Sequence, residues 1–169
     1  NLRNAISREA EAVITIPIWC KEDIRVMLNH YIVTIEQEIG DVEKDFTMSL
    51  ETTDSPDFYI SQEDAERLLQ ALYACPHGMT AMSKTMPGLV ETSTNLASVK
   101  MKEDEKGAFV EINTSQRSSI ESKKHDIKQM VECALALACD EVTHGDGYPG
   151  WAPNPQSPLL EVTKKAYQD

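Results

Sequence analysis

The residue types that could carry chemistry are widely spaced along this chain. The four histidines are His30, His77, His125 and His144. They are too far apart for a local zinc motif such as H-E-x-x-H. Cys133 and Cys139 lie six residues apart, so they do not share one face of a helix. No serine has the sequence context of a nucleophile elbow. The sequence therefore predicts no catalytic residue and no metal site in this segment.

One glycine-rich stretch, from Gly145 to Gly150, matches the pattern G-x-G-x-x-G letter for letter. A dinucleotide-binding loop of this kind opens a helix whose backbone N–H groups are free to bind phosphate. Pro149 and Pro153 cannot supply such donors, and both interrupt regular structure. We therefore expect a shaped loop between Tyr148 and Ser157 and no nucleotide site.

Composition narrows the class of protein further. The chain has 169 residues, of which 41% are apolar, and this is enough to bury a core. Its 16 basic and 28 acidic residues give a formal charge of −12, which repels phosphate backbones and acidic bilayers. No apolar run reaches the roughly 18 residues of a membrane span. We expect neither nucleic acid nor a membrane as partner, and the scattered cysteines indicate reduced thiols in the cytoplasm.

Hydrophobic periodicity predicts the elements that must position any site. Alternating apolar residues predict strands over residues 2–18, 46–50, 89–101 and 108–117. Three- and four-residue spacing predicts helices over residues 21–42, 61–73 and 122–139, and from Ser157 onward. A loop is expected from Pro76 to Gly88. This order favours the α+β class, with an antiparallel or mixed sheet covered by helices and residues 2–50 forming one β-α-β unit.

Both ends of the chain fall inside expected elements. The first residues read as a strand already under way, and the last ones as a helix cut off at Asp169. We therefore expect an excised segment of a longer protein, in which residues 1–157 form an inserted domain. An inserted domain returns the chain to its host, so Leu2 and Ser157 should lie near the same end of the structure.

Four stretches resemble one family of enzymes. Residues 1–10, NLRNAISREA, are similar to the family strand LRNAIPREA, and residues 87–97, PGLVETSTNLA, are similar to GVVETSLNLG. Residues 112–119, INTSQRSS, resemble a strand that ends in IRSS. Residues 148–159, YPGWAPNPQSPL, resemble the loop YPGWxPNPxSPL, the most specific of the four. The family is that of the cytosolic aminoacyl-histidine dipeptidases, di-zinc metallopeptidases related to carnosinases and succinyl-diaminopimelate desuccinylases.

This resemblance implies a division of labour between two domains. Family members have a catalytic domain that holds two zinc ions, or other divalent ions, and a lid domain inserted into it. The resemblance assigns residues 1–157 to the lid, a substrate-recognition domain with ferredoxin-like β-α-β units. Residues 158–169 would begin a helix that leads back to the missing catalytic domain. The parent protein would hydrolyse Xaa-His and related dipeptides, whereas this segment alone would be inactive because the metal ligands lie elsewhere.

The resemblance also assigns two substrate-binding residues. Arg117 matches the lid arginine that receives the terminal carboxylate of the substrate, and Asn4 matches the lid asparagine that hydrogen-bonds to it. A guanidinium can hold a carboxylate through two hydrogen bonds, which suits Arg117 to this role. The sequence alone equally allows an exposed Arg117 paired with a nearby acid, and an Asn4 that bonds its own backbone in a turn. Ser7 stands where relatives usually have proline.

The partners implied by the family are a dipeptide substrate, the protein's own catalytic domain and a second copy in a homodimer. Tyr148 and Trp151 could line the substrate cleft or pack at the domain junction, and we favour the junction. The alternative to substrate recognition is a non-catalytic interaction or dimerisation module, in which the peptidase-like motifs serve only the fold.

Overall fold

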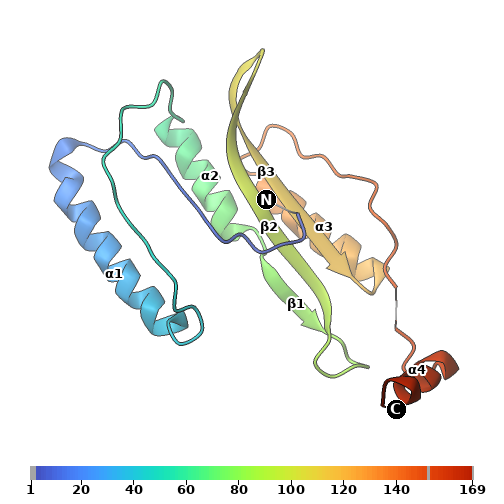
Figure 1. Ribbon diagram of the computed structural model, residues 1–169. Helices are drawn as coiled ribbons and strands as arrows, with labels where there is room; N and C mark the ends of the chain where they lie inside the picture. Colours follow the sequence, from blue (N-terminus) through green and yellow to red (C-terminus); the bar gives the residue numbers. More distant parts are fainter. Residues whose placement is uncertain (1–2, 152, 169) are drawn as a thin grey trace. The chain divides into compact units, whose positions relative to one another are not determined.

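The computed structural model describes residues 3–151 and 153–168 and has the α+β architecture that the sequence predicts. The described elements are η1 (Ile18–Cys20), α1 (Lys21–Ile39), α2 (Gln62–Ala74), β1 (Gly78–Met82), β2 (Val90–Asp104), β3 (Gly107–Ser118), α3 (Glu121–Leu135) and α4 (Pro158–Gln168) (Figure 1). Contacts divide the chain into two units. The smaller unit comprises residues 10–59, and the larger one combines the chain up to Glu9 with the chain from Ile60 onward.

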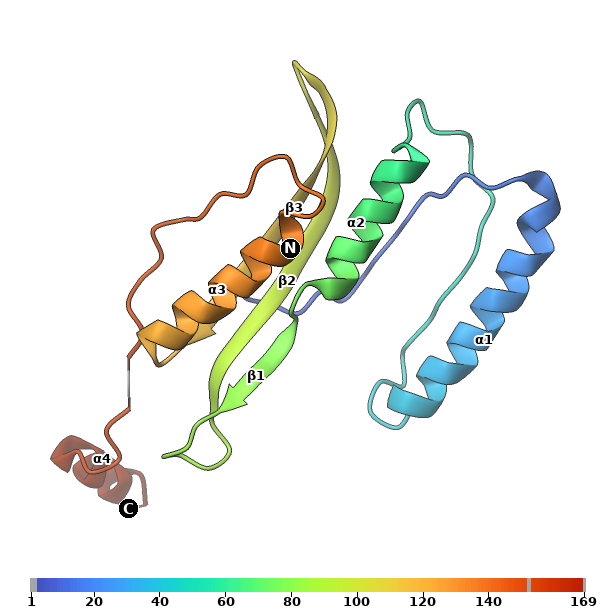
Figure 2. The ribbon, with the colours of Figure 1, turned by 180° about the vertical axis from the view of Figure 1, so that it is seen from behind.

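The larger unit is built on a three-stranded antiparallel sheet in the order β1-β2-β3. Helix α3 contacts β2 and β3 on one face of this sheet, and α2 contacts α3 (Figures 1 and 2). The buried centre consists of Cys75, Val131 and Leu135, with Ile112 of β3 packed against them. The core therefore lies between the sheet and the two helices.

The pairing of β2 with β3 decides which side chains face away from the helices. It runs from Asp104 opposite Gly107 to Thr92 opposite Ser118, with one register shift between Leu96 and Ser98. Side chains alternate between the two faces of a strand, so Arg117 lies on the face opposite to Ile112. We call this second face the open face. Its residues are Ser93, Asn95, Ser98, Lys100, Lys102 and Asp104 of β2, and Gly107, Phe109, Glu111, Asn113, Ser115 and Arg117 of β3.

The register shift is a β-bulge at Ala97, which changes the alternation along β2. Before the bulge Ser93 and Asn95 lie on the open face, and after it the even-numbered residues of β2 do. This is why the apolar alternation of residues 89–101 is imperfect in the sequence. The hairpin itself is confirmed, and its strands extend the predicted ranges by a few residues.

The smaller unit contains α1 and two extended segments. The half-buried side chains of Leu28 and Ile32 line a shallow groove of about 240 Å³ together with Met48–Leu50. The strands predicted over residues 2–18 and 46–50 are wrong, because neither segment forms a strand in the described residues, and with them the β-α-β unit is lost. Alternation gives a segment the propensity of a strand, but a strand forms only where a neighbouring backbone completes its hydrogen bonds.

The other predictions from periodicity are largely confirmed. Helix α2 begins after Ser61, whose Oγ accepts a hydrogen bond from the Asp64 N–H at 3.1 Å. Helix α1 ends before Gly40, and α4 begins at Pro158. The loop expected from Pro76 to Gly88 is wrong in part, because it contains β1, whose first residue Gly78 has a φ of +93°. The expected proximity of Leu2 and Ser157 involves Leu2, which lies outside the described residues.

None of the helices in the described part of the chain combines the length and the apolar character needed to cross a bilayer.

The buried centre gives the first prediction. Leu135→Ala should lower the free energy of unfolding of the larger unit by about 2–5 kcal/mol, because it leaves a cavity against Cys75 and Val131. Leu137→Ala is the matched control, since that side chain is 64% exposed, and it should change stability by about 0.5 kcal/mol or less. Urea unfolding followed by circular dichroism measures both. Equal effects of the two substitutions would contradict the assigned core.

Candidate functional site

Arg117 lies at the end of β3 on the open face, directly opposite Ser93 of β2. Its side chain is exposed. Within the described residues no carboxylate forms an ion pair with its guanidinium. An unpaired guanidinium on a polar sheet face can accept a carboxylate from outside the segment.

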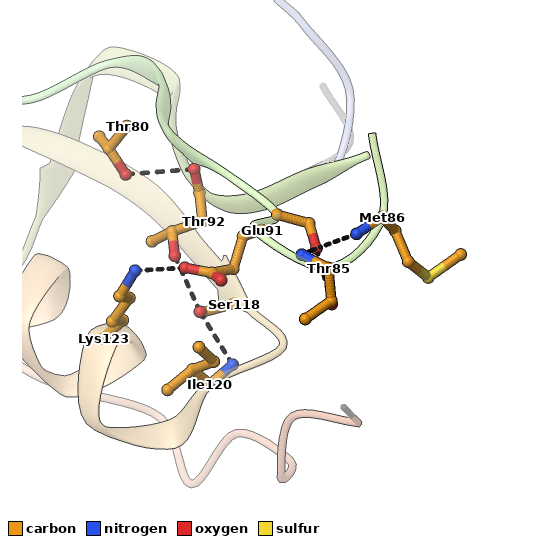
Figure 3. A network of polar contacts seen from close by, with 9 residues as sticks. Thr80, Thr85, Met86, Glu91, Thr92, Ser118, Ile120 and Lys123 are labelled. Carbon is orange, nitrogen blue, oxygen red and sulfur yellow. Dashed lines mark hydrogen bonds and ion pairs between the residues drawn. The ribbon is translucent and has the colours of Figure 1, made fainter. Parts of the chain in front are cut away.

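The backbone beside Arg117 is fixed by a polar network on the helix-covered face (Figure 3). The Thr92 and Ser118 hydroxyls are 2.9 Å apart, and Ser118 Oγ accepts a hydrogen bond from the Ile120 N–H at 3.1 Å. Thr92 is buried, and its carbonyl accepts from the Thr80 hydroxyl at 3.1 Å. These bonds join β1, the start of β2 and the end of β3 next to Arg117.

A buried ion pair completes this network. Glu91 is 7% exposed, and one of its carboxylate oxygens pairs with the ammonium of Lys123 on α3 (Figure 3). The Glu91 carbonyl accepts a hydrogen bond from the Ser119 N–H at 3.1 Å. A buried carboxylate is tolerated only when it is paired in this way. Glu91 therefore links β2 to the start of α3, close to the end of β3 that carries Arg117.

The segment that contains Asn4 is held against the open face by Asn95. The Asn95 Nδ2 group donates to the Arg3 carbonyl at 3.1 Å and to the Ala5 carbonyl at 2.8 Å. Asn4 lies between these two carbonyls, in an exposed turn. Because Asn95 and Arg117 lie on the same face of adjacent strands, two residues apart along the sheet, Asn4 and Arg117 are brought to one region of the surface.

Ser7 supplies a second attachment for the same segment. Its hydroxyl donates to the carbonyl of Ala97 at 2.9 Å. Ala97 is the bulge residue, whose backbone is not part of the regular ladder. Ser7, at the position where the family resemblance leads us to expect proline, therefore ties the segment down through its side chain, whereas proline would restrict it through its ring.

A polar depression of about 300 Å³ adjoins this segment on the open face. Its basic lining residues are Arg3, Lys100 and Lys102. Glu111 pairs with Lys102 at 2.8 Å, and hydrogen bonds from Lys102 and Asn113 lower the pKa of its carboxyl. The open face therefore carries more positive than negative charge, although the whole chain is strongly acidic.

The loop at Tyr148–Gly150 is fixed beside the same end of β3. A Cβ atom on Gly150 would lie 2.5 Å from the Ser118 carbonyl oxygen, so only glycine allows this close approach. The Gly150 N–H donates to the Glu121 carboxylate at 3.1 Å, and Lys124 Nζ donates to the Tyr148 carbonyl at 2.7 Å. The loop motif and Arg117 are thus neighbours in space.

The aromatic side chains of this loop are solvent-exposed. Tyr148 is 75% exposed and Trp151 is 79% exposed. Two large exposed aromatic residues in a tied loop suit a contact with another part of the protein or with a ligand. The choice between the domain junction and the substrate cleft stays a prediction.

Sequence reasoning missed Asn95 and the residues around Arg117 that fix its backbone. Asn95 lies inside the quoted stretch PGLVETSTNLA, so the motif contained the residue, but alternation alone gave it no role. Its Oδ1 atom is buried and has no hydrogen-bond partner among the described residues. An unsatisfied buried acceptor costs about 1–3 kcal/mol. The structure thus retains asparagine here at a cost in stability.

The described residues do not provide a metal site. No group of three or more histidine, cysteine, aspartate or glutamate side chains among them could hold a metal ion. The two zinc ions that the family resemblance implies therefore find no set of donors here, and no chemical step is assigned to a metal in this segment.

Comparison with known proteins gives the class first: the chain is similar to two proteins that are named as dipeptidases, whereas no family model matches it. The chain is 29% identical over 167 residues to the cytosol non-specific dipeptidase of Escherichia coli (strain K12), covering 99% of this chain and 34% of that protein. It also superposes on the crystal structure of the aminoacylhistidine dipeptidase from Vibrio alginolyticus, with a TM-score of 0.78 and 26% identity. That match covers 90% of this chain and 30% of the other.

The chain is therefore homologous to a segment of these dipeptidases and spans about a third of their length. This confirms the resemblance drawn from the four sequence stretches.

The hydrogen bond between Gly150 and the Glu121 carboxylate should break only at a pH below the usual range in which glutamate titrates. Hydrogen bonds from Lys124, and then from the Gly150 N–H, lower the pKa of the Glu121 carboxyl. The ionised form is thus favoured in the folded state, and the bond should persist as pH falls through the usual range of glutamate. It should be lost only below the lowered pKa. The amide proton shift of Gly150, followed by NMR against pH, should titrate at that lower value.

Glu121→Gln should abolish this titration while keeping an oxygen that accepts from Gly150. Glu111→Gln is the matched control and should leave the Gly150 titration unchanged, because Glu111 bonds Lys102 and Asn113. A Gly150 shift that titrates in Glu121→Gln as in the wild type would contradict the assigned contact.

Proposed function

We propose that this chain is the lid and substrate-recognition domain of a metallo-dipeptidase that hydrolyses Xaa-His and related dipeptides. The observation that carries the proposal is the exposed Arg117 on the open face, beside the segment of Asn4, in a chain homologous to part of two dipeptidases. In this proposal Arg117 receives the terminal carboxylate of the dipeptide and Asn4 hydrogen-bonds to its backbone.

The local charge supports this assignment. A dipeptide carries a carboxylate at its C-terminus, and the open face offers the basic side chains of Arg3, Lys100 and Arg117. Several cations on one face attract an anion even when the net charge of the chain is negative. When the substrate carboxylate leaves water and binds the guanidinium of Arg117, two parallel hydrogen bonds fix both its position and its orientation.

The chemistry of peptide hydrolysis belongs, in this proposal, to another part of the protein. The described residues lack a set of metal donors, so we place the ligands of two zinc or other divalent ions in a catalytic domain outside this segment. The segment alone is expected to be inactive, because no group in its open face can activate water. A cytoplasmic location would agree with the name of the Escherichia coli relative.

The test uses the full-length protein that carries this chain. Arg117→Ala should lower kcat/KM for dipeptides with a free C-terminus by about 30-fold or more. This corresponds to a loss of about 2–5 kcal/mol of transition-state stabilisation. Dipeptides with an amidated C-terminus should lose little, because the contact is absent in both proteins. Arg117→Lys should restore only part of the activity, since a point charge lacks the second parallel donor.

Arg25→Ala is the matched control, because Arg25 forms an exposed pair with Glu22 on α1. Its kcat/KM should remain that of the wild type. If free and amidated dipeptides lose activity equally in Arg117→Ala, then Arg117 does not bind the carboxylate.

The second candidate, an interaction or dimerisation module, draws on the apolar surface of the smaller unit. Helix α1 has no buried residue, and Val26, Met27 and Tyr31 are each more than half exposed. In the smaller unit Ile18 and Trp19 are also 79% exposed. Such a surface suits burial against another domain or a second copy of the chain. Homodimerisation and substrate recognition can coexist in one protein.

Tyr31→Lys separates the two candidates. If α1 forms the dimer contact, this substitution should lower the molar mass of the full-length protein measured by light scattering. Tyr73→Lys is the matched control, because Tyr73 on α2 is 96% exposed. A pure interaction module would show this loss of mass with no effect of Arg117→Ala on kcat/KM. An unchanged mass in Tyr31→Lys would contradict a dimer contact through this face.

A further inference from the structure

We propose that Asn95 is a positioning residue for Asn4, and that it sets the distance between the two substrate-binding residues of the open face. This inference rests on the proposed function, because Asn4 acts on substrate only if the segment belongs to a dipeptidase. Asn95 itself does not contact substrate in this proposal. It acts by fixing the turn from which Asn4 projects.

The geometry of the two hydrogen bonds carries the argument. The two hydrogens of the Asn95 amide go to the carbonyls of Arg3 and Ala5, at 3.1 and 2.8 Å. These carbonyls flank Asn4 on either side along the chain. Holding both fixes the backbone of the turn, and with it the direction of the Asn4 side chain.

The second observation is that the buried Oδ1 atom of Asn95 has no hydrogen-bond partner within residues 3–151 and 153–168. Because Nδ2 has two carbonyl acceptors, the amide cannot be turned over to give Oδ1 a donor without facing oxygen toward oxygen. A site that served only stability would favour a residue without an orphaned acceptor. The amide is therefore held in one orientation by its bonds to the Asn4 turn.

The bulge at Ala97 explains why Asn95 can reach this turn. Ser7 Oγ donates to the bulge carbonyl at 2.9 Å, so the segment is attached at two points, on either side of Leu96. Asn95 lies opposite Ser115, two pairs along the ladder from the pair of Ser93 and Arg117. The rigid hairpin therefore relates the Asn4 turn to Arg117 through Asn95.

The test is made in the full-length protein with Asn95→Asp, which keeps the shape of the side chain and replaces its two donors. Backbone amides of the segment Asn4–Glu9 should exchange with deuterium at least tenfold faster, while those of β3 should not change. The kcat/KM for a free dipeptide should fall at least tenfold. Asn29→Asp is the matched control: it makes the same change on exposed α1 in the smaller unit, outside the open face, and should show neither effect.

Two readouts separate positioning from a general structural role. In the Asn4→Ala background, Asn95→Asp should cause little further loss of kcat/KM, because the residue it positions is already absent. The activity of Asn95→Asp relative to wild type should also rise as pH falls, because a protonated carboxyl can donate to one of the two carbonyls. Should Asn95→Asp lose exchange protection in β3, Asn95→Ser, which removes the amide without adding charge, carries the same test.

The failures of the two proposals are distinguishable. Unchanged exchange of the segment Asn4–Glu9, or fully additive effects of the Asn4 and Asn95 substitutions, would overturn the positioning role while Arg117→Ala still tests the lid. Wild-type kcat/KM in both Asn4→Ala and Arg117→Ala would overturn the proposed function. It would also overturn the contribution that Asn95 makes to substrate binding through Asn4. In that case the exchange data alone would still establish whether Asn95 holds the turn.

Discussion

The pairing of β2 with β3 is the constraint on which the candidate site depends. Its register puts Asn95 and Arg117 on one face and Ile112 on the other, against the buried centre. A slip by one residue would send each side chain of the slipped strand to the opposite face. At the bulge β2 contains one extra residue, Ala97, which shifts its alternation by one position. Asn95 before the bulge and Lys100 after it therefore both lie on the open face.

Charge is distributed unevenly with respect to this register. The net charge of −12 argues against phosphate-rich partners, yet the basic side chains of Arg3, Lys100 and Arg117 belong to one polar face. Among the described residues of this face, Glu111 forms an ion pair with Lys102. A small anion responds mainly to the charges that lie close to it, because salt screens charges that are more than about 10 Å away. The acidic composition and the anion-binding hypothesis are therefore compatible.

The sequence predicted the helices and the hairpin because these depend on local periodicity. The stripe of α1, the N-cap Ser61 and the Pro158 start of α4 all arise from neighbouring residues. The strands expected over residues 2–18 and 46–50 failed because strand formation needs a partner that periodicity does not reveal. Strand β1 was missed for the converse reason. It has only five residues, too few for a clear periodicity, and it forms because its backbone pairs with β2.

The site was only partly accessible to sequence reasoning for a related reason. Arg117 and Asn4 came from motif resemblance, but their common location arises from the bonds of Asn95 to Arg3 and Ala5, which join residues about 90 positions apart. Gly150 is close to Ser118 in the same non-local way. Spacing along the chain carries no signal for such contacts.

The buried polar ladder behind Arg117 has a physical consequence for recognition. Thr92 and Thr94 occupy helix-covered positions that apolar residues would fill with more hydrophobic stabilisation, and they bond Ser118 and Gln116 instead. Hydrophobic contacts are not directional, so an apolar ladder would tolerate small rotations of the end of β3. Hydrogen bonds with defined angles resist such rotations. A guanidinium that must present two parallel donors to a carboxylate depends on its orientation, so a directional ladder beneath it is the more suitable support.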